Sequence, residues 1–193
     1  MKLNLGCGHD YREGWVNVDR SKLVKADVYC NVDLPEFEKD LIPLKNNTCT
    51  YIYMSHLLEH IKNPLRLMQD LHRIAAPDCK LLIRTPYGSS DNAWEDPTHV
   101  RPYFLGSFGY FSQAAYGGAD YGYRGDWETV DRTLILKAGT GIEQIQDNLE
   151  DVLSIIMVQR NLVDEIQVKM RAVKPIRTPG TFQEKAPIHF KFQ

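Results

Sequence analysis

The stretch LNLGCGHDYREGWVNVD, residues 3–19, decides the expected fold, because it places two short apolar runs on either side of a glycine-containing turn. The first run, residues 2–5, predicts a strand that ends at Gly6, and the second, residues 15–19, predicts a strand that ends at Asp19. Glycines at the carboxyl end of a first strand let the backbone turn sharply and let a ligand approach closely. The pattern indicates the start of a parallel sheet with a ligand site at its carboxyl edge.

The rest of the chain repeats this alternation of short apolar runs and turn residues, which is typical of a mostly parallel α/β sheet with covering helices. Apolar residues recur at helical spacing between 65 and 74, so residues 63–76 are expected to form a helix with Asn63 as its N-cap. A second helical stretch is expected over 142–162, and an extended tail over 175–193. Further strands are expected over 26–32, 51–54, 80–85, 133–137 and 165–173.

The connection between the first two strands is short. About ten residues lie between them, whereas a parallel crossover that carries a helix takes a dozen or more. The first helix is therefore expected to be lost or reduced to a turn. A bound ligand would then depend more on Gly8 and neighbouring backbone groups than on a helix dipole.

Composition narrows the class of protein. The 193 residues are 43% hydrophobic, which is enough for one sizeable core, so a single domain spanning 1–193 is expected. Twenty-three basic and 25 acidic residues give a net charge of −2, which offers no long-range field for a nucleic acid. No stretch approaches the roughly 20 apolar residues of a membrane span, and the four separated cysteines form no CxxC pair. We therefore expect a cytoplasmic protein with free thiols, no nucleic-acid partner and no membrane span.

Two acidic residues follow neighbouring strands of the predicted sheet. Asp19 ends the second expected strand, and Asp33 follows the third. Because ligands of open α/β sheets bind at the carboxyl ends of the strands, both carboxylates are expected at one site. A carboxylate after the second strand can accept hydrogen bonds from a ribose diol, and one after the third can meet an adenine amino group. Taken singly, each acid is at least as compatible with a solvated loop residue as with a ligand-binding one. The prediction therefore rests on the order in which the glycine loop and the two acids follow successive strands.

Three runs taken together resemble a known family: LNLGCGHDYREGWVNVD (3–19), DVYCNVDLPE (27–36) and YIYMSHLLEHIKNPLRLMQDLHRIAAPDCKLLIRTPY (51–87). They are similar to class I S-adenosylmethionine (SAM)-dependent methyltransferases, and most of all to a compact bacterial subgroup whose chains open on the glycine motif. The resemblance covers about residues 2–103, with a weaker match over 164–175. It implies a Rossmann-like, doubly wound, mostly parallel seven-stranded sheet whose last strand, 165–173, is antiparallel.

The resemblance also implies where the cofactor SAM binds. The glycine loop would contact its methionine part, the acid after the second strand its ribose, and the acid after the third strand its adenine, on which a leucine would pack. Residues after the fourth strand would line the sulfonium end. In chain order, the residues with these roles are Gly6, Cys7, Gly8, Asp19, Asp33, Leu34, Ser55 and His56. The chain departs from the family at Asn4, where an acid is usual, and at Asp10, where a third glycine is common.

The segment after the fifth strand is expected to meet the methyl acceptor. Histidine side chains in general titrate near neutrality, so His99 is suited to take a proton from a hydroxyl or amine, and similar DPTH-x-R stretches occur in the subgroup. Asp96, Arg101 and Tyr103 are the other residues expected at the acceptor. Residues 87–127 are rich in Gly, Tyr and Phe without a clear period, so they are expected to close over the site as a lid. About half of their aromatic side chains are expected to pack on the sheet instead.

These expectations combine into one function: transfer of a methyl group from SAM to a hydroxyl or amine of a small molecule or saccharide. The oligomeric state is left open. A SAM-binding module without catalysis is one alternative. A second is a zinc hydrolase, because residues 56–60 (HLLEH) spell HxxEH and match the zinc motif of one peptidase class when they are helical. That match is only three residues long, so local hydrogen bonds are expected for the motif, and no metal site.

Overall fold

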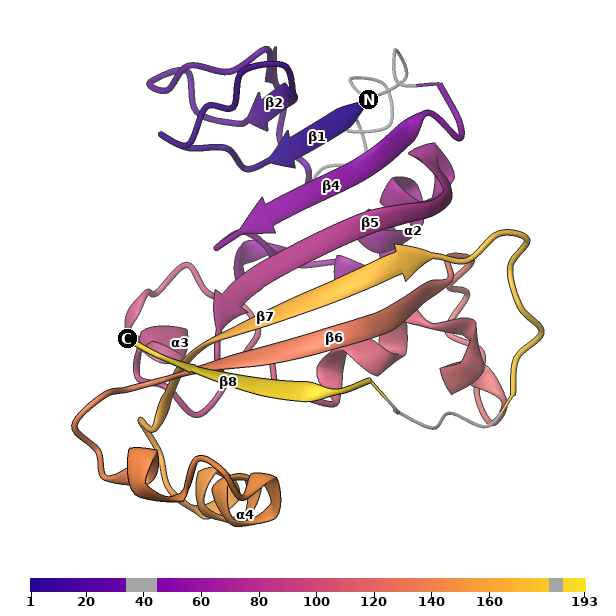
Figure 1. The fold of residues 1–193 in the computed structure, drawn as a ribbon. Coiled ribbons are helices and arrows are strands. Elements are labelled where there is room, and N and C mark those ends of the chain that lie inside the picture. The colour runs from indigo at the N-terminus through magenta and orange to yellow at the C-terminus, as the bar shows by residue number, and fades with distance from the viewer. Residues whose placement is uncertain (34–44, 181–185) are drawn as a thin grey trace.

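The computed structural model describes residues 1–33, 45–180 and 186–193. Its strands are β1 (Lys2–Leu5), β2 (Val16–Asp19), β3 (Val28–Tyr29), β4 (Cys49–Ser55), β5 (Ala75–Pro86), β6 (Trp127–Leu136), β7 (Val163–Ala172) and β8 (Ile188–Phe192). They form one sheet in the order β3-β2-β1-β4-β5-β7-β6-β8 (Figure 1). Neighbouring strands are parallel except where β7 pairs with β5 and with β6. The expected Rossmann-like α/β class, with an antiparallel strand near the end of the chain, is confirmed.

Two strands at the far edge of the sheet differ from the expectation. The strand expected over 133–137 begins six residues earlier, at Trp127. The tail that was expected only to be extended contributes β8, so the sheet has eight strands where seven were expected. β8 pairs in parallel with β6, from Arg132 opposite Ile188 to Leu136 opposite Phe192. Its sequence IHFKF alternates apolar and polar side chains, which is the period of a strand with one face on the protein.

The connection between β1 and β2, all of which is described, contains no helix, as its length predicts. Asn17, a fully buried residue of β2, holds this connection in place of a helix. Its side-chain oxygen accepts a hydrogen bond from the Arg12 backbone N–H (2.9 Å). Its side-chain nitrogen donates to the carbonyls of Arg12 (2.9 Å) and Trp15 (3.2 Å). One side chain therefore satisfies backbone groups that a helix would have paired internally.

The helix between β4 and β5, α2 (Pro64–Ile74), covers one face of the sheet (Figure 1). Asn63 caps it as expected, because the Asn63 side-chain oxygen accepts a hydrogen bond from the Arg66 backbone N–H (3.1 Å). Leu67, Leu71 and other apolar residues of α2 are buried against the strands. The apolar stripe of the helix thus forms one side of the core.

Two 3₁₀ helices, η2 (Ser107–Phe111) and η3 (Gln113–Tyr116), lie on the same face as α2 (Figure 1). In the part of the chain that the structure describes, no helix covers the opposite face. There Lys80, Lys169 and Arg171 are exposed on neighbouring strands. The connection between β1 and β2, which contains no helix, adds no cover to this face.

The later helical stretch, expected over 142–162, forms η4 (Ile142–Ile145) and α4 (Leu149–Val158). Both lie beside the strands and not over the exposed face (Figure 1). The remaining short helices are η1 (Leu58–His60), directly after β4, and α3 (Asn92–Glu95), after β5. Within the described ranges, no helix combines the length and apolarity needed to cross a bilayer.

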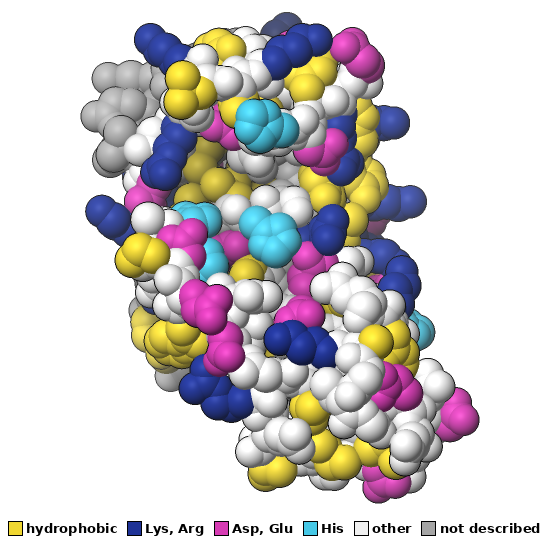
Figure 2. All heavy atoms as spheres, turned by 90° about the vertical axis from the view of Figure 1, so that its left-hand side faces the viewer, with side chains coloured by type: hydrophobic (Ala, Val, Ile, Leu, Met, Phe, Trp, Pro, Cys, Tyr) yellow, Lys and Arg dark blue, Asp and Glu magenta, His cyan; other side chains and the backbone are white. Residues whose placement is uncertain are grey.

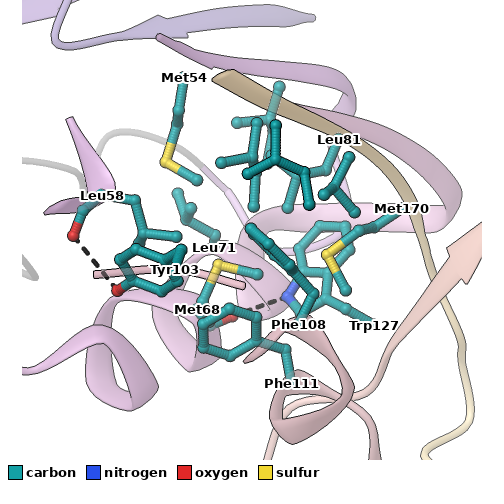
Figure 3. Close-up of a cluster of buried hydrophobic side chains, with 14 of the residues drawn as sticks. Met54, Leu58, Met68, Leu71, Leu81, Tyr103, Phe108, Phe111, Trp127 and Met170 are labelled. Atoms are coloured by element: carbon teal, nitrogen blue, oxygen red, sulfur yellow. Dashed lines mark hydrogen bonds between the residues drawn. The ribbon is translucent and has the colours of Figure 1, made fainter. Parts of the chain in front are cut away.

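The core fills the space between the covered face and α2 (Figure 3). Two of its buried aromatic side chains have paired polar groups: the Trp127 indole N–H donates to the Met68 carbonyl (2.9 Å), and the Tyr103 hydroxyl donates to the Leu58 carbonyl (3.3 Å). Tyr103 and Trp127 are 2% or less exposed, together with Phe108 and Phe111 of the same segment. These four side chains belong to the part of the aromatic set that was expected to pack on the sheet, and the closure of residues 87–127 over a site stays a prediction.

Candidate cofactor and acceptor site

A cavity of about 880 Å³ opens at the carboxyl ends of β1, β2 and β4. Figure 2 looks onto this edge and shows the hollow, with histidine side chains around it. Of the eight residues expected at the cofactor, Leu34 lies outside the described residues. The other seven all line the cavity: Gly6, Cys7, Gly8, Asp19, Asp33, Ser55 and His56. The cavity is large enough for a ligand of nucleotide size.

The glycine loop is held in a conformation that favours glycine. Gly6 and Gly8 have φ angles of 66° and 49°, in the left-handed region. A Cβ at Gly6 would lie 2.9 Å from a terminal carbon of Leu57, so a side chain at this position would require Leu57 to shift. The Gly8 N–H donates to Asp19 Oδ2 (2.8 Å), while Asp19 Oδ1 accepts from the Ser21 N–H (2.8 Å). Asp19 therefore fastens the loop and still keeps lone pairs for a ligand, since a carboxylate offers about four acceptor sites.

The part of the cavity wall near Asp33 combines apolar side chains with one carboxylate. Cys30, Val32 and Ile61 line it, next to Asp33. Asp33 Oδ1 accepts a hydrogen bond from the Lys62 backbone N–H (2.9 Å), which fixes the carboxylate beside the segment after β4. Apolar walls with a single oriented acceptor suit a flat ring that carries an amino group.

Below the glycine loop, a polar cluster joins β4, β5 and β7. The imidazole of His56 contacts Glu165 (Nε2 to Oε2, 3.0 Å) and Glu59 (Nδ1 to Oε1, 3.5 Å). These two carboxylates raise the pKa of His56 to about 9, so the ring is a cation at neutral pH. Arg84 makes a bidentate pair with Glu165 through Nε (3.0 Å) and Nη2 (2.9 Å). Burial alone would raise the pKa of Glu165, but the hydrogen bonds from His56 and Arg84 outweigh it and lower this pKa to about 2.

A second histidine in the cavity wall is His60, at the end of η1. Its ring packs edge-to-face on His99, with 4.7 Å between the ring centroids. The His60 Nδ1 lies 3.0 Å from the hydroxyl of Thr98, which also lines the cavity. His99 is mostly buried and is not part of the cavity wall; its Nδ1 lies 3.2 Å from the Ala93 carbonyl oxygen.

A family model described as a methyltransferase domain matches residues 3–117, more than half of the chain. The chain belongs to this methyltransferase family. A comparison of the methyltransferase with curated protein sequences finds no match. The cofactor of the family is SAM. The cavity fits it, because the carboxylates of Asp19 and Asp33 offer hydrogen-bond acceptors and the lining residues Gly6 and Gly8 have no Cβ.

Solved structures share the fold of the methyltransferase. A SAM-dependent methyltransferase from Archaeoglobus fulgidus superposes with a TM-score of 0.57 at 17% identity, covering 88% of this chain and 85% of that one. A SAM-dependent methyltransferase from Mesorhizobium loti gives a TM-score of 0.55 at 11% identity, covering 88% of this chain and 89% of that one. At such low identity the likeness shows the fold alone.

The three substrate residues expected at the methyl acceptor, Asp96, Arg101 and Tyr103, do not line the cavity of the methyltransferase, in contrast to the residues expected at the cofactor. Tyr103 is buried and its hydroxyl is occupied by Leu58, so the structure does not bring it to the cavity. Arg101 is exposed and, like Asp96, does not line the cavity. Asp96 instead accepts hydrogen bonds from the backbone N–H and hydroxyl of Thr98 (2.8 and 2.7 Å). From this segment, Pro97, Thr98 and Val100 form part of the wall.

The HxxEH motif is not the helical zinc motif of a peptidase. His56 has a φ of 50° and precedes the 3₁₀ helix, so His56 and His60 do not share one helical face. The His56 ring pairs with Glu165, whereas the His60 ring packs on His99. Without two histidines directed at a common ion, the motif lacks the geometry that the hydrolase alternative requires.

Several wall residues of the methyltransferase were not anticipated. Arg84 belongs to β5 and Tyr53 to β4, and Glu165, which pairs with Arg84, belongs to β7. The sequence contains one signal for them: charged residues in strands whose neighbours are apolar, as in KLLIRTP and DEIQV. That signal marks a buried ion pair without telling which charges meet.

The raised pKa of His56 gives a direct prediction. In an NMR titration, the ring of His56 is expected to show a midpoint near pH 9. Because the folded pKa lies above the ordinary value of 6.5, this pairing stabilises the fold fully below about pH 6.5 and is lost as the pH rises through 9. Glu165→Gln is expected to move the midpoint down toward the ordinary value.

Gln167→Ala is the matched control, because Gln167 donates to Glu165 Oε1 (2.7 Å) and has no contact with the ring of His56 in the described structure. It is expected to leave the midpoint above pH 8. A wild-type midpoint near 6.5 would show that the ion pair between His56 and Glu165 does not form in solution.

Proposed function

We propose that this methyltransferase transfers the methyl group of SAM to a hydroxyl or amine of a small molecule or saccharide. One observation supports the proposal: the cavity that contains the expected cofactor residues is also lined by polar side chains outside that set, His60, Thr98 and Arg84 among them. A cofactor held by Asp19 and Asp33 would leave this wall for an acceptor. Polar groups with hydrogen-bonding capacity on that wall are compatible with an acceptor that carries hydroxyls or amines.

SAM supplies an already activated methyl group, so the protein has to align the acceptor and exclude water. Asp19 and the glycine loop would hold the ribose and methionine parts, and Asp33 the adenine. Asn4 lies under the loop, where the family usually has an acid. Both hydrogens of its side-chain amide are donated, to the Asp10 carbonyl (2.6 Å) and to Asn17 Oδ1 (3.1 Å). Its oxygen is therefore the atom that could accept from the ammonium group of the cofactor.

His99 remains our candidate for the group that receives the proton of the acceptor, acting with His60. His60 lines the cavity, and His99 packs directly on it. His99→Ala is expected to lower turnover by about 100-fold, because a positioned general base contributes at least that much. The same variant is expected to bind S-adenosylhomocysteine (SAH), the demethylated cofactor, within about twofold of the wild type.

His189→Ala is the control for this variant, since His189 lies on β8 and is exposed, away from the cavity. Turnover should be unchanged in it. Full turnover in His99→Ala together with normal SAH binding would remove the base assignment.

The function itself is tested in two steps. Calorimetric titration with SAH, with NAD as a control ligand, is expected to show micromolar binding of SAH alone. The protein is then incubated with isotope-labelled SAM and a panel of hydroxyl- and amine-bearing metabolites, saccharides and single-stranded RNA, and SAH formation is measured. Acceptor-dependent SAH formation with a metabolite or saccharide supports the proposal. Tight SAH binding with neither acceptor-dependent nor slow background turnover supports the non-catalytic alternative, and turnover with RNA alone contradicts the proposed acceptor class.

A further inference from the structure

Glu59, His60 and His99 stand apart from the residues that would hold the cofactor. Glu59 and His60 belong to η1, after β4, and His99 belongs to the loop after α3. One ligand atom from each of the three side chains lies within 4.8 Å of the other two. We propose that these three residues bind a divalent first-row transition-metal ion.

The hydrogen bonds of His60 leave the nitrogen that a metal needs. Its Nδ1 lies 3.4 Å from the Thr98 carbonyl oxygen, which can only accept a hydrogen bond. The Thr98 hydroxyl, 3.0 Å from the same nitrogen, already donates its proton to Asp96 Oδ1 (2.7 Å). Nδ1 of His60 must therefore carry the hydrogen, and in the neutral ring Nε2 carries the free lone pair.

The same argument applies to His99. Its Nδ1 lies 3.2 Å from the Ala93 carbonyl oxygen, so Nδ1 again is the donor and Nε2 keeps the lone pair. An imidazole that donates one ring N–H to an oxygen and offers the other nitrogen is the usual state of a metal-binding histidine. Both rings are thus held in the tautomer that ligation requires.

Glu59 adds a buried carboxylate whose hydrogen bonding is incomplete. The residue is 2% exposed, and Oε2 accepts from the Thr85 hydroxyl (3.0 Å). Oε1 is buried and accepts no hydrogen bond from the residues that the structure describes; its ionic contact with His56 spans 3.5 Å. This long contact with the His56 ring leaves acceptor capacity on Oε1, since each carboxylate oxygen offers about two lone pairs, so Oε1 can serve as a metal ligand.

The donor set selects the kind of ion. Two imidazole nitrogens with one carboxylate suit zinc and its neighbours in the first transition row, whereas magnesium and calcium prefer oxygen donors throughout. Metal–nitrogen bonds of about 2.0–2.1 Å hold tetrahedral donors about 3.4 Å apart, so the three side chains must draw together slightly on binding. Asp96 can complete the set, because its Oδ2 lies 3.8 Å from His99 Nε2.

This site differs from the peptidase motif in its residues, because His56 is replaced by His99 from another part of the chain. His60 lines the cavity, so an ion on it would stand at the wall proposed for the acceptor. There it could lower the pKa of a coordinated hydroxyl, in which case His60 and His99 would be ligands and not the base. Only this last role rests on the proposed function; metal binding itself does not.

The test is metal binding by the whole chain after dialysis against a chelator. Titration with Co²⁺, followed by its visible absorption and by calorimetry, is expected to show one ion per chain, and Zn²⁺ is expected to displace it. His60→Gln and His99→Gln are each expected to weaken Co²⁺ binding by at least about 100-fold. Thr98→Val keeps all ligands but removes the hydroxyl that orients His60, and is expected to weaken binding about tenfold.

His189→Gln removes an exposed histidine elsewhere and is the matched control, expected to bind Co²⁺ like the wild type. Circular dichroism of every variant shows whether it is folded, and SAH titration tests the cofactor site separately. If His60→Gln or His99→Gln fails to fold, Thr98→Val carries the test alone. Absence of stoichiometric Co²⁺ binding in the wild type, or equal binding in the folded ligand variants, would overturn the proposal even where SAH binds normally.

Discussion

Asp19→Ala is expected to weaken SAH binding by at least about 100-fold. The carboxylate is proposed to accept both ribose hydroxyls, and hydrogen bonds to a charged group are each worth about 1.5–3 kcal/mol, so losing two exceeds the 2.8 kcal/mol that corresponds to 100-fold. The substitution also frees Gly8, whose N–H is fastened to Asp19 Oδ2 at 2.8 Å. Calorimetric titration with SAH measures the effect directly.

Asp120→Ala provides the control for charge removal, because Asp120 is exposed, pairs with Arg124 and lies outside the cavity wall. Its SAH affinity should match that of the wild type. An Asp19→Ala variant that remains folded and binds SAH within threefold of the wild type would place the ribose elsewhere.

Arg177→Met is expected to cost about 3 kcal/mol of unfolding free energy. Arg177 donates to the fully buried carboxylate of Asp126 from Nε (2.8 Å) and Nη2 (2.7 Å), in addition to its backbone N–H (3.0 Å). Removing one partner of a buried pair leaves an uncompensated charge and typically costs 3–5 kcal/mol. The lower end applies here, because Arg177 is about one-third exposed and Asp126 keeps its bond from the Gln113 N–H (3.1 Å). Urea unfolding without cofactor measures the difference.

The same pair predicts a dependence on pH. Burial alone would raise the pKa of Asp126, but the hydrogen bonds from Arg177 and Gln113 outweigh it, so this pKa lies below the ordinary 3.8. The contribution of the pair is therefore complete above the ordinary value and is lost as the pH falls through the folded pKa. The gap between wild type and Arg177→Met should narrow in acid. Arg160→Met, which breaks an exposed pair with Asp91, is the control and should cost less than about 0.5 kcal/mol at any pH.

The cofactor end could be predicted from the sequence because its features are local. Gly6, Gly8 and Asp19 stand at the ends of short apolar runs, and parallel pairing of β1 with β2 and β4 is enough to bring those ends together. The missing first helix was equally predictable, because the length of a connection limits what it can contain. These inferences need strand positions but no knowledge of side-chain packing.

The acceptor end could not be predicted in the same way, because it depends on which side chains become buried. Tyr103 and Thr98 belong to one irregular segment, yet Tyr103 packs into the core and Thr98 reaches the cavity. No periodicity distinguishes them in the sequence. His56 was expected beside the sulfonium and does line the cavity, but its cationic state depends on Glu165, which lies more than a hundred residues later. β8 was missed for a related reason, since its partner β6 is far away along the chain and its five residues give only a weak period.

One face of the sheet is covered by no helix in the described part of the chain, so a fluorescent label can be attached there. Lys169 projects from that face with an exposed side chain whose ammonium group pairs with Asp131. The four native cysteines are all buried, and burial together with the charge of Asp19 raises the pKa of the Cys7 thiol, which keeps it unreactive. A single cysteine introduced as Lys169→Cys would therefore take a thiol-reactive fluorophore selectively. The labelled protein could be followed by its fluorescence, with the dye attached outside the cavity wall.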